Sequence, residues 1–207
     1  MAVLDLQPIP VTTSPVRRLP QLFGGLALYG ASMGLMIRSG LGLDPWDVLH
    51  QALANRTGLT FGTVTAVVGA LVLLCWIPLR QRPGVGTVSN IVVIAFAVDL
   101  TLAVVTQPSS LVMRIVFLVA GVVLNGLASA SYIGVRLGPG PRDGLMTGFS
   151  ARSGLSIRLV RTGIELTVLA TGWLLGGTVG VGTVVYALAI GPLTQAFLPL
   201  VAWRMKE

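Results

Sequence analysis

The chain has 207 residues, of which 54% are hydrophobic and 10% charged, and its mean hydropathy is +0.86. This composition excludes a water-soluble globular domain, because so few charges could not keep the remaining apolar surface soluble. The net charge of +7 comes from basic residues placed between apolar runs, which favours the positive-inside rule of membrane proteins over nucleic-acid binding. Cys75 is the only cysteine, so a disulfide framework and a cysteine-based metal site are also excluded.

The apolar runs predict six membrane spans, each close to the roughly 20 residues that a helix needs to cross a bilayer. The expected spans lie near residues 20–38, 61–79, 86–106, 112–134, 159–176 and 182–202. Residues 1–18 are rich in proline and end in Arg17-Arg18, and they predict a flexible cytoplasmic leader before a retained first span. We therefore expect an all-α membrane protein.

The chain repeats itself after 96 residues without a gap. Over residues 25–105, 24 of 81 positions carry the same residue as the position 96 further on, whereas chance would give roughly one in ten. The identities gather in motifs that shared hydrophobicity does not explain, such as Gly84–Val88 and Gly180–Val184. We expect two three-helix repeats, residues 19–109 and 110–207. An odd number of spans in each would invert the second repeat, a symmetry typical of transporters.

The distribution of basic residues predicts the orientation of the chain. With the N-terminus inside the cell, 11 of the 14 basic residues lie at the inner face. This inner set consists of Arg17, Arg18, Arg80, Arg82, Arg136, Arg142, Arg152, Arg158, Arg161, Arg204 and Lys206. Only Arg38, Arg56 and Arg114 then lie outside. Both termini are therefore expected in the cytoplasm.

Each repeat also contains a short segment between its first two spans, Asp44–Asn55 and Gly140–Ala151. Pro45 and Pro141 stand where a helix has its first residue, a position that does not need the backbone N–H that proline lacks. Twelve helical residues rise about 18 Å, which is too short for a hydrocarbon core of about 30 Å. Each segment is expected to lie on the membrane interface or to dip in and return.

Glycines punctuate both repeats at matching positions and are expected to be structural. Gly58 and Gly154 follow a basic residue at the end of each short segment and predict helix stops. The other matched glycines precede the short segments or begin the last span of each repeat. They are Gly42, Gly86, Gly138 and Gly182.

Several of these motifs resemble one protein family. The runs Gly40–Leu49, Arg56–Val64, Gly138–Thr147 and Gly180–Pro192 are similar to those of the YczE-like bacterial integral membrane proteins, which are grouped with YitT-like proteins. The resemblance covers about residues 20–202. It implies a multi-pass protein of the bacterial cytoplasmic (inner) membrane without a settled activity. Some members lie near genes for nonribosomal peptide synthesis, which suggests a link to secondary metabolism. The resemblance carries no catalytic residues.

The repeat places Asp47 and Asp143 at the same position of the two short segments. Either residue could stabilise the helix start through a capping box. Alternatively, the two carboxylates could line a substrate pathway, one from each repeat. Trp46 pairs with Arg142 in the repeat, and Trp46 could be an interface anchor or a pathway residue. His50, the only histidine, could be a polar interface residue or part of that pathway, but one histidine does not make a metal site.

Carboxyl groups inside the expected spans are costly in hydrocarbon, which makes each of them a candidate functional residue. Glu165 has Arg161 one helical turn earlier, so a structural ion pair is the simpler interpretation. Asp99 has no basic residue within one turn, and its counterpart in the repeat is Gln195. Asp99 and Gln195 are therefore candidate pathway residues in the bundle interior.

Two functions are compatible with these patterns. The first is a small secondary transporter or permease that moves an unidentified small solute or metabolite between two inverted repeats. The second is a membrane scaffold or accessory protein that supports a biosynthetic or export complex. We expect no enzyme activity, cofactor, metal site or nucleic-acid partner. The bilayer is the expected environment, and a homodimer through glycine-rich faces is a possible assembly.

Overall fold

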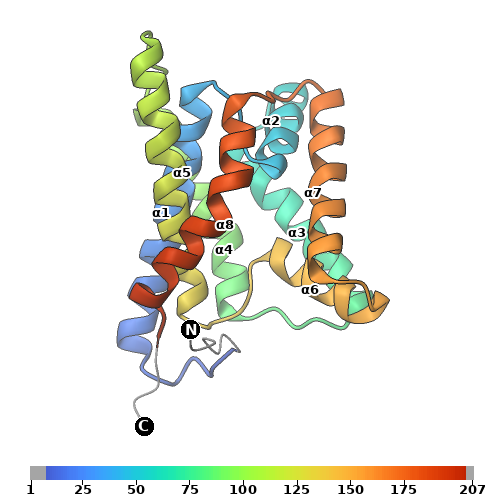
Figure 1. Ribbon diagram of the computed structural model, residues 1–207. Coiled ribbons are helices and arrows are strands. Elements are labelled where there is room, and N and C mark those ends of the chain that lie inside the picture. The colour runs from blue at the N-terminus through green and yellow to red at the C-terminus, as the bar shows by residue number, and fades with distance from the viewer. Residues whose placement is uncertain (1–7, 204–207) are drawn as a thin grey trace.

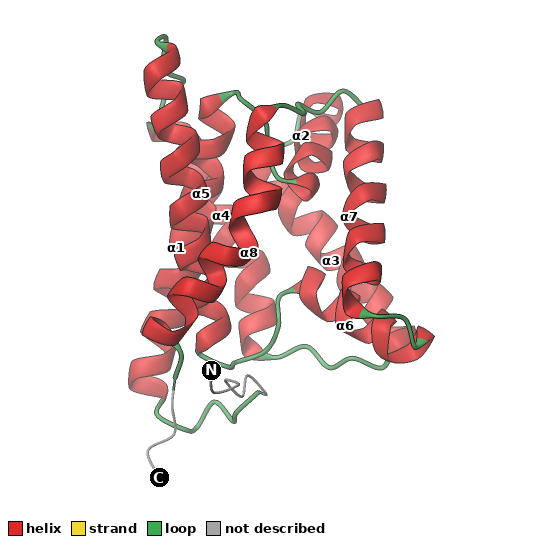
Figure 2. Cartoon of the chain, in the orientation of Figure 1, coloured by secondary structure: helices red, strands yellow, loops and turns green. Residues whose placement is uncertain are grey.

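The computed structural model describes residues 8–203, which form eight helices and no strand (Figures 1 and 2). The prediction of an all-α protein is confirmed. The helices are α1 (Pro15–Ser39), α2 (Pro45–Thr57), α3 (Phe61–Leu79), α4 (Val85–Val104), α5 (Leu111–Gly134), α6 (Pro141–Ser153), α7 (Ile157–Leu174) and α8 (Val181–Val201).

Each of the six expected spans corresponds to one long helix, but only four of these are long and apolar enough to cross a membrane by themselves: α3, α4, α5 and α8. The other two, α1 and α7, contain more polar residues. Helix α7 carries Arg158, Arg161 and Glu165, and α1 carries arginines near both ends. Length and composition by themselves therefore identify four spans among the described residues.

The N-terminal leader is shorter than expected, because α1 begins at Pro15. Arg18 is fully buried, and its guanidinium donates hydrogen bonds to the carbonyl oxygens of Pro10, Thr13 and Val135 at 2.7–2.9 Å. These bonds attach the segment before α1 to the end of α5. Residues 1–7 of the expected leader, and Arg204 and Lys206 of the expected inner basic set, lie outside the described residues.

The duplication is visible in the helix boundaries. Helices α6, α7 and α8 begin 96 residues after α2, α3 and α4. Figure 1 shows α1 running upward and its counterpart α5 running downward. In the same view the short helix α2 lies in the upper part of the bundle and α6 in the lower part. Corresponding elements therefore run in opposite directions through the molecule.

The helices pack in two groups. In the first group, α1 packs against α4 and α5, and α5 packs against α8. In the second, α2 packs on α7 and α6 packs on α3, so each short helix contacts a long helix of the other repeat. Contact between α3 and α4 joins the two groups. The two repeats are thus interlocked, and neither forms a separate domain.

The surface of the long helices is strongly apolar. Large side chains stand more than two-thirds exposed on α3, α4, α5, α7 and α8, as shown by Ile77, Phe96, Val112, Leu174 and Leu188. Water would not tolerate an apolar surface of this extent, whereas lipid chains cover it without cost. The bundle is therefore built for a bilayer.

Candidate functional site

The short helices α2 and α6 begin inside the bundle with the same backbone geometry. The Asp44 carboxylate caps α2 by accepting hydrogen bonds from the backbone N–H groups of Trp46, at 2.8 Å, and Asp47, at 3.0 Å. Gly140 occupies the same place before α6 and has no side chain to do so. Pro45 and Pro141 are the first helical residues, and Gly58 and Gly154 end the helices with φ of +73° and +72°. The start of α2 thus holds a carboxylate that α6 lacks.

Glycine contacts between the repeats fix where the short helices begin. Gly42 and Gly138 both have φ of +120°, a conformation that favours glycine. A Cβ atom on Gly42 would lie 2.8 Å from the backbone nitrogen of Gly180. The adjacent N–H groups of Gly182 and Gly86 donate to the carbonyl oxygens before these turns, Leu41 at 2.7 Å and Leu137 at 2.9 Å. The turn before each short helix is therefore held by the start of the last long helix of the other repeat, in the same way on both sides.

Each short helix also packs on a long helix, and in these two contacts the large and the small residue occupy opposite positions. The Trp76 ring of α3 fills the space beside Gly144 of α6, where an added Cβ would overlap it, and its indole N–H donates to the Pro141 carbonyl at 3.0 Å. The counterpart of Trp76 is Gly172 of α7, and that of Gly144 is Val48 of α2. Gly172 lies against the backbone of Val48 and Leu49. One contact is filled by an aromatic ring and the other by close approach of two helices.

The starts of α2 and α6 meet at an ionic cluster. The guanidinium carbon of Arg142 lies 5.0 Å from the centre of the Trp46 ring, which is its own counterpart in the repeat. Arg142 also lies 3.7 Å from one oxygen of Asp44 and 3.7 Å from one oxygen of Asp47. The Nδ1 atom of His50 is 3.2 Å from the same Asp47 oxygen. Asp44, Asp47 and His50 are at most 2% exposed.

A cavity of about 100 Å³ adjoins this cluster and lies between the two helix groups. Its walls come from both repeats in a regular way, since 14 of its 21 lining residues form pairs separated by 96 positions. The seven pairs are Asp44/Gly140, Pro45/Pro141, Trp46/Arg142, His50/Met146, Thr65/Arg161, Gly69/Glu165 and Asn90/Tyr186. The cavity therefore lies where the corresponding surfaces of the two repeats face each other.

Most of the candidate site residues gather here. Trp46, His50, Arg142 and Asp143 line the cavity, and Asp47 contacts Arg142 directly behind its wall. Asp143 accepts a hydrogen bond from the Tyr132 hydroxyl at 2.7 Å.

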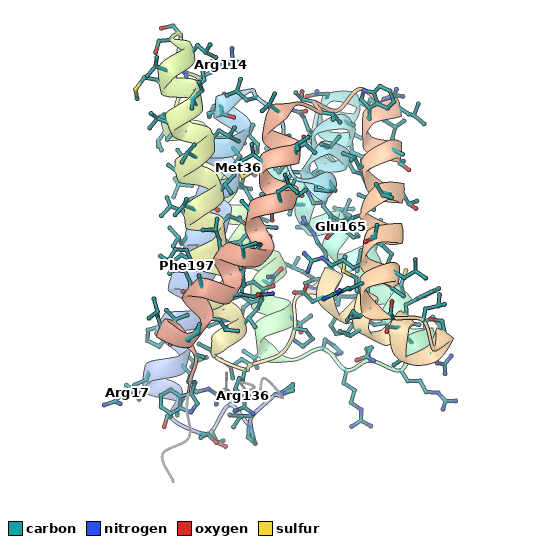
Figure 3. The ribbon with its side chains drawn as sticks, viewed as in Figure 1. Arg17, Met36, Arg114, Arg136, Glu165 and Phe197 are labelled. Atoms are coloured by element: carbon teal, nitrogen blue, oxygen red, sulfur yellow. The ribbon has the colours of Figure 1, made fainter. Side chains whose placement is uncertain are left out.

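The expected ion pair also forms, with Arg161 Nε 2.9 Å from Glu165 Oε1, and both residues line the cavity. Figure 3 shows Glu165 near mid-height of the bundle. The pair thus lies beside the candidate site, and not at the end of the bundle, where the positions of Arg158 and Arg161 in the sequence had put it.

Two candidate residues lie elsewhere. Asp99 is not among the lining residues. It instead accepts hydrogen bonds from the Thr60 hydroxyl, at 2.5 Å, and the Gly62 N–H, at 2.7 Å, so it caps the start of α3 from α4. Gln195 is exposed on α8 and is also absent from the cavity wall. Neither residue therefore contributes to the wall of this cavity, and a pathway role for Asp99 and Gln195 stays a prediction.

Four further expectations from the sequence are also corrected. Trp46 is 6% exposed and is covered by Arg142, so it is no interface anchor. His50 is 1% exposed, so it is no polar residue of the membrane surface. Asp47 does not complete a capping box, because its Oδ1 atom contacts His50 and Arg142 and its Oδ2 atom has no hydrogen-bond partner. Arg142 belongs to the buried cluster and does not count toward a basic inner face.

Sequence reasoning missed the phenolic side chains of the site, which are Tyr29, Tyr132 and Tyr186 from α1, α5 and α8. It also missed Thr65 and Asn90. A signal was present in the repeat: Asn90 and Tyr186 are polar counterparts that follow the identical Gly-Val-Gly-Thr-Val motifs by two residues. The cavity is thus marked by polar residues that differ between the two copies and lie next to motifs that are identical in both. Within residues 8–203 no group of three His, Cys, Asp or Glu side chains is arranged to hold a metal ion.

Comparison with known proteins places the chain in a family. A family model described as "Family of unknown function (DUF6198)" matches residues 16–199. The chain belongs to this family. It is also 34% identical over 179 residues to the uncharacterized membrane protein YczE of Bacillus subtilis, covering 86% of this chain and 83% of that protein. The resemblance to YczE-like proteins is therefore confirmed, and the chain is a membrane protein.

Two further relatives span similar lengths. An uncharacterized protein of Haemophilus influenzae is 40% identical over 190 residues, which cover 92% of this chain and 87% of that protein. The uncharacterized protein YyaS of Bacillus subtilis is 28% identical over 181 residues, covering 86% of this chain and 90% of YyaS. No solved structure matches the chain. None of the names of these relatives assigns an activity, so a proposed function depends on the geometry of the site.

Proposed function

We propose that this member of the family is a small transporter of the bacterial cytoplasmic membrane, with the cavity between the starts of α2 and α6 as its solute site. Six helices, α1, α3, α4, α5, α7 and α8, cross the bilayer. The two repeats are inverted, and α2 and α6 enter from opposite sides and begin near its middle. Discontinuous helices that begin at the midplane are a common device for solute sites in transporters with inverted repeats.

The observation that carries this proposal is a group of buried polar atoms that have no partner among residues 8–203 and that belong to the cavity wall or, for Asp47, lie directly behind it. They are Asp44 Oδ2, Asp47 Oδ2, His50 Nε2 and Trp46 Nε1. A buried polar atom without a hydrogen bond costs about 1–3 kcal/mol, so a protein that served only as a scaffold would gain stability by replacing these residues with apolar ones. Unpaired polar groups inside an apolar bundle are best explained as the binding groups of a solute that is present for part of a cycle.

The distribution of charge supports the orientation. Arg17 and Arg136 lie at the lower end of the bundle in Figure 3, the end at which both the N-terminal segment and the end of α8 lie, and Arg114 lies at the upper end. Because basic residues are retained on the cytoplasmic side, the lower end faces the cytoplasm in this proposal. The α6 end of the pathway then opens inward and the α2 end outward.

The experiment uses a thiol inside the cavity. The exposed Cys75 is first replaced by Ser. Single cysteines are then placed at Ile91, which lines the cavity, and at its neighbour Val92, which is 63% exposed on the outer face of α4. A membrane-impermeant methanethiosulfonate reagent is applied to intact cells and to inside-out vesicles. Such reagents modify thiolates in water and spare thiols in lipid.

We expect Ile91→Cys to react from both sides, since an alternating pathway brings water to the cavity from each side in turn. Val92→Cys should remain unmodified, and it controls for helix α4 itself. If Ile91→Cys reacts from one side only, or is as unreactive as Val92→Cys, transport through this cavity is contradicted. The protein would then be better explained as a membrane scaffold, whose function would not require an accessible interior.

A further inference from the structure

The unpaired atoms at the cavity are mainly hydrogen-bond acceptors. An ionised carboxylate only accepts, so Asp44 Oδ2 and Asp47 Oδ2 both lack a donor. The proton of His50 is assigned to Nδ1, because this atom faces Asp47 Oδ1 at 3.2 Å, which leaves Nε2 as a third unpaired acceptor. The indole N–H of Trp46 is the only donor in the unpaired group of this cluster. A ligand that satisfies the cluster must donate hydrogen bonds.

The charges of the cluster also favour a ligand of this kind, because they favour a positive charge. Asp44, Asp47 and Asp143 bring three carboxylates, and Arg142 brings one positive charge. The Arg161–Glu165 ion pair is neutral. The starts of α2 and α6 contribute about half a positive charge each. The cluster therefore holds an excess of about one negative charge in a buried place, where a counter-charge is strongly favoured.

Aromatic rings form much of the remaining wall. Tyr29, Tyr132 and Tyr186 line the cavity together with Trp46, and the rings of Tyr29 and Tyr132 meet edge to face at 6.1 Å between centres. Aromatic faces attract cations through the ring quadrupole, and the site already uses this interaction where Arg142 covers Trp46. A carboxylate flanked by aromatic rings is a common way to recognise an organic cation.

The cavity limits the ligand to a few atoms. Its volume is about 100 Å³, which is smaller than a cavity of about 150 Å³ that holds benzene. A long polyamine does not fit in this conformation, whereas a single ammonium or guanidinium group with a small substituent does.

We propose that the cavity binds a small organic cation with N–H donors. Asp44 and His50 accept hydrogen bonds from these N–H groups, and the aromatic side chains of the wall surround the cation. This inference rests on the proposed function and names the class of its solute. The N–H groups satisfy the unpaired acceptors, and the positive charge balances the excess of the carboxylates. Arg142 stays between Asp44 and Asp47 and keeps the two carboxylates from repelling each other in the empty state.

The test measures the thermal stability of the purified full chain in detergent with methylammonium chloride. Sodium chloride, tetramethylammonium chloride and sodium acetate at equal ionic strength are the comparison salts. Methylammonium should raise the melting temperature above the value in sodium chloride, because a ligand that binds only the folded state stabilises it by mass action. Tetramethylammonium has no N–H donor and should give less than half of this shift.

The variant Asp44→Asn retains an oxygen to cap α2 but loses the charge, and it should weaken the apparent affinity for methylammonium at least tenfold. His50→Gln is a second variant in case Asp44→Asn does not fold, and it should also weaken binding. The matched control is Asp99→Asn, a carboxylate outside the cavity, which should keep the full shift.

Three results would overturn the inference. One is a shift with acetate that is lost in Arg142→Gln, which would show an anion site. Another is a melting temperature in methylammonium chloride no higher than that in sodium chloride, and the last is a shift with tetramethylammonium as large as that with methylammonium. All of these leave the thiol test on Ile91 unaffected, so a failure of the ligand class is distinguishable from a failure of transport.

Discussion

The two repeats share a framework but contribute opposite chemistry to the site. In both, a glycine with φ of +120° comes before a 13-residue helix that begins with a proline and ends at a glycine. In the first repeat this framework carries Asp44, Trp46 and a buried Asp47. In the second, the same positions hold Gly140, Arg142 and a half-buried Asp143. Duplication supplied the geometry, and divergence at a few positions supplied a negative wall and the cation that faces it.

The packing of the repeats differs as well. Helix α3 packs along α4, whereas the corresponding helices α7 and α8 make no comparable contact. The residues of α7 are accordingly exposed, with only Val160 and Gly172 buried along its length. If the repeats are inverted, an exchange of these two arrangements would close the cavity at one end and open it at the other. In the proposed transporter, the difference between the repeats would describe one state of the alternating pathway.

The largest expected effect comes from imposing the packing of one repeat on the other. Gly144→Val gives α6 the residue that α2 has at Val48, but here the Trp76 ring occupies the space. We expect loss of more than about 3 kcal/mol and little folded protein, because a buried ring cannot move aside. The measurement is the yield and melting temperature of the purified protein in detergent.

The double variant Gly144→Val with Trp76→Gly reproduces the pair that Val48 and Gly172 form in the other contact. It should recover part of the lost stability, since the space is then free for a close helix contact. A double variant no more stable than Gly144→Val alone would show that the two contacts are not equivalent, and it would break the comparison of the repeats at this place.

The local elements of the fold could be predicted from the sequence, but these contacts between helices could not. The repeat, the two Pro-initiated short helices and the span of α3 at residues 61–79 follow from local patterns that the structure reproduces. The pairing of α2 with α7 and of α6 with α3 does not. It depends on Gly172 and Gly144 meeting partners that are distant in sequence, and a glycine in an apolar run has no signal that names its partner.

The second prediction concerns the cation that crosses between the repeats. Arg142→Gln leaves the Asp44 and Asp47 carboxylates buried without their counter-charge. We expect destabilisation by about 3 kcal/mol, the lower end for a broken buried ion pair, because the Arg142 side chain is 25% exposed. Thermal unfolding in detergent measures this.

Adding Asp47→Asn to Arg142→Gln removes one of the orphaned charges and should restore part of the stability. If the double variant were less stable than Arg142→Gln, the two residues would act independently. The buried cluster could then not be the point at which the chemistry of the two repeats is joined.

The smallest expected effects come from Asp99 and its counterpart Gln195. Asp99→Ala removes two hydrogen bonds at the start of α3, and we expect a loss of about 1–3 kcal/mol. Gln195→Ala changes an exposed side chain and should stay within about 0.5 kcal/mol. Equal losses of unfolding free energy in Asp99→Ala and Gln195→Ala would contradict the different roles of these two counterpart positions of α4 and α8. Neither change should alter the methylammonium shift.

The site was less predictable than the fold. Trp46, Arg142 and His50 could be found because these positions differ between the two copies, and Asp47 because it recurs as Asp143. Their burial could not be found, since it depends on how two short helices meet. That Asp99 lies outside the cavity wall could not be foreseen, because the repeat does not give the direction of a side chain. Aromatic residues of the long helices, such as Tyr29, have the same appearance in a sequence whether they face lipid or a cavity.

The central claim is that the two repeats are inverted around a shared cavity, and two matched positions test it most directly. Leu59 and Leu155 are counterparts in the repeat, they follow α2 and α6, and they are 49% and 45% exposed. Each is replaced by Cys in the Cys75→Ser background and labelled with an impermeant thiol reagent in intact and in opened cells. We predict that Leu59→Cys reacts in intact cells and Leu155→Cys only after opening. If both react under the same condition, the repeats are parallel, and the alternating pathway is contradicted.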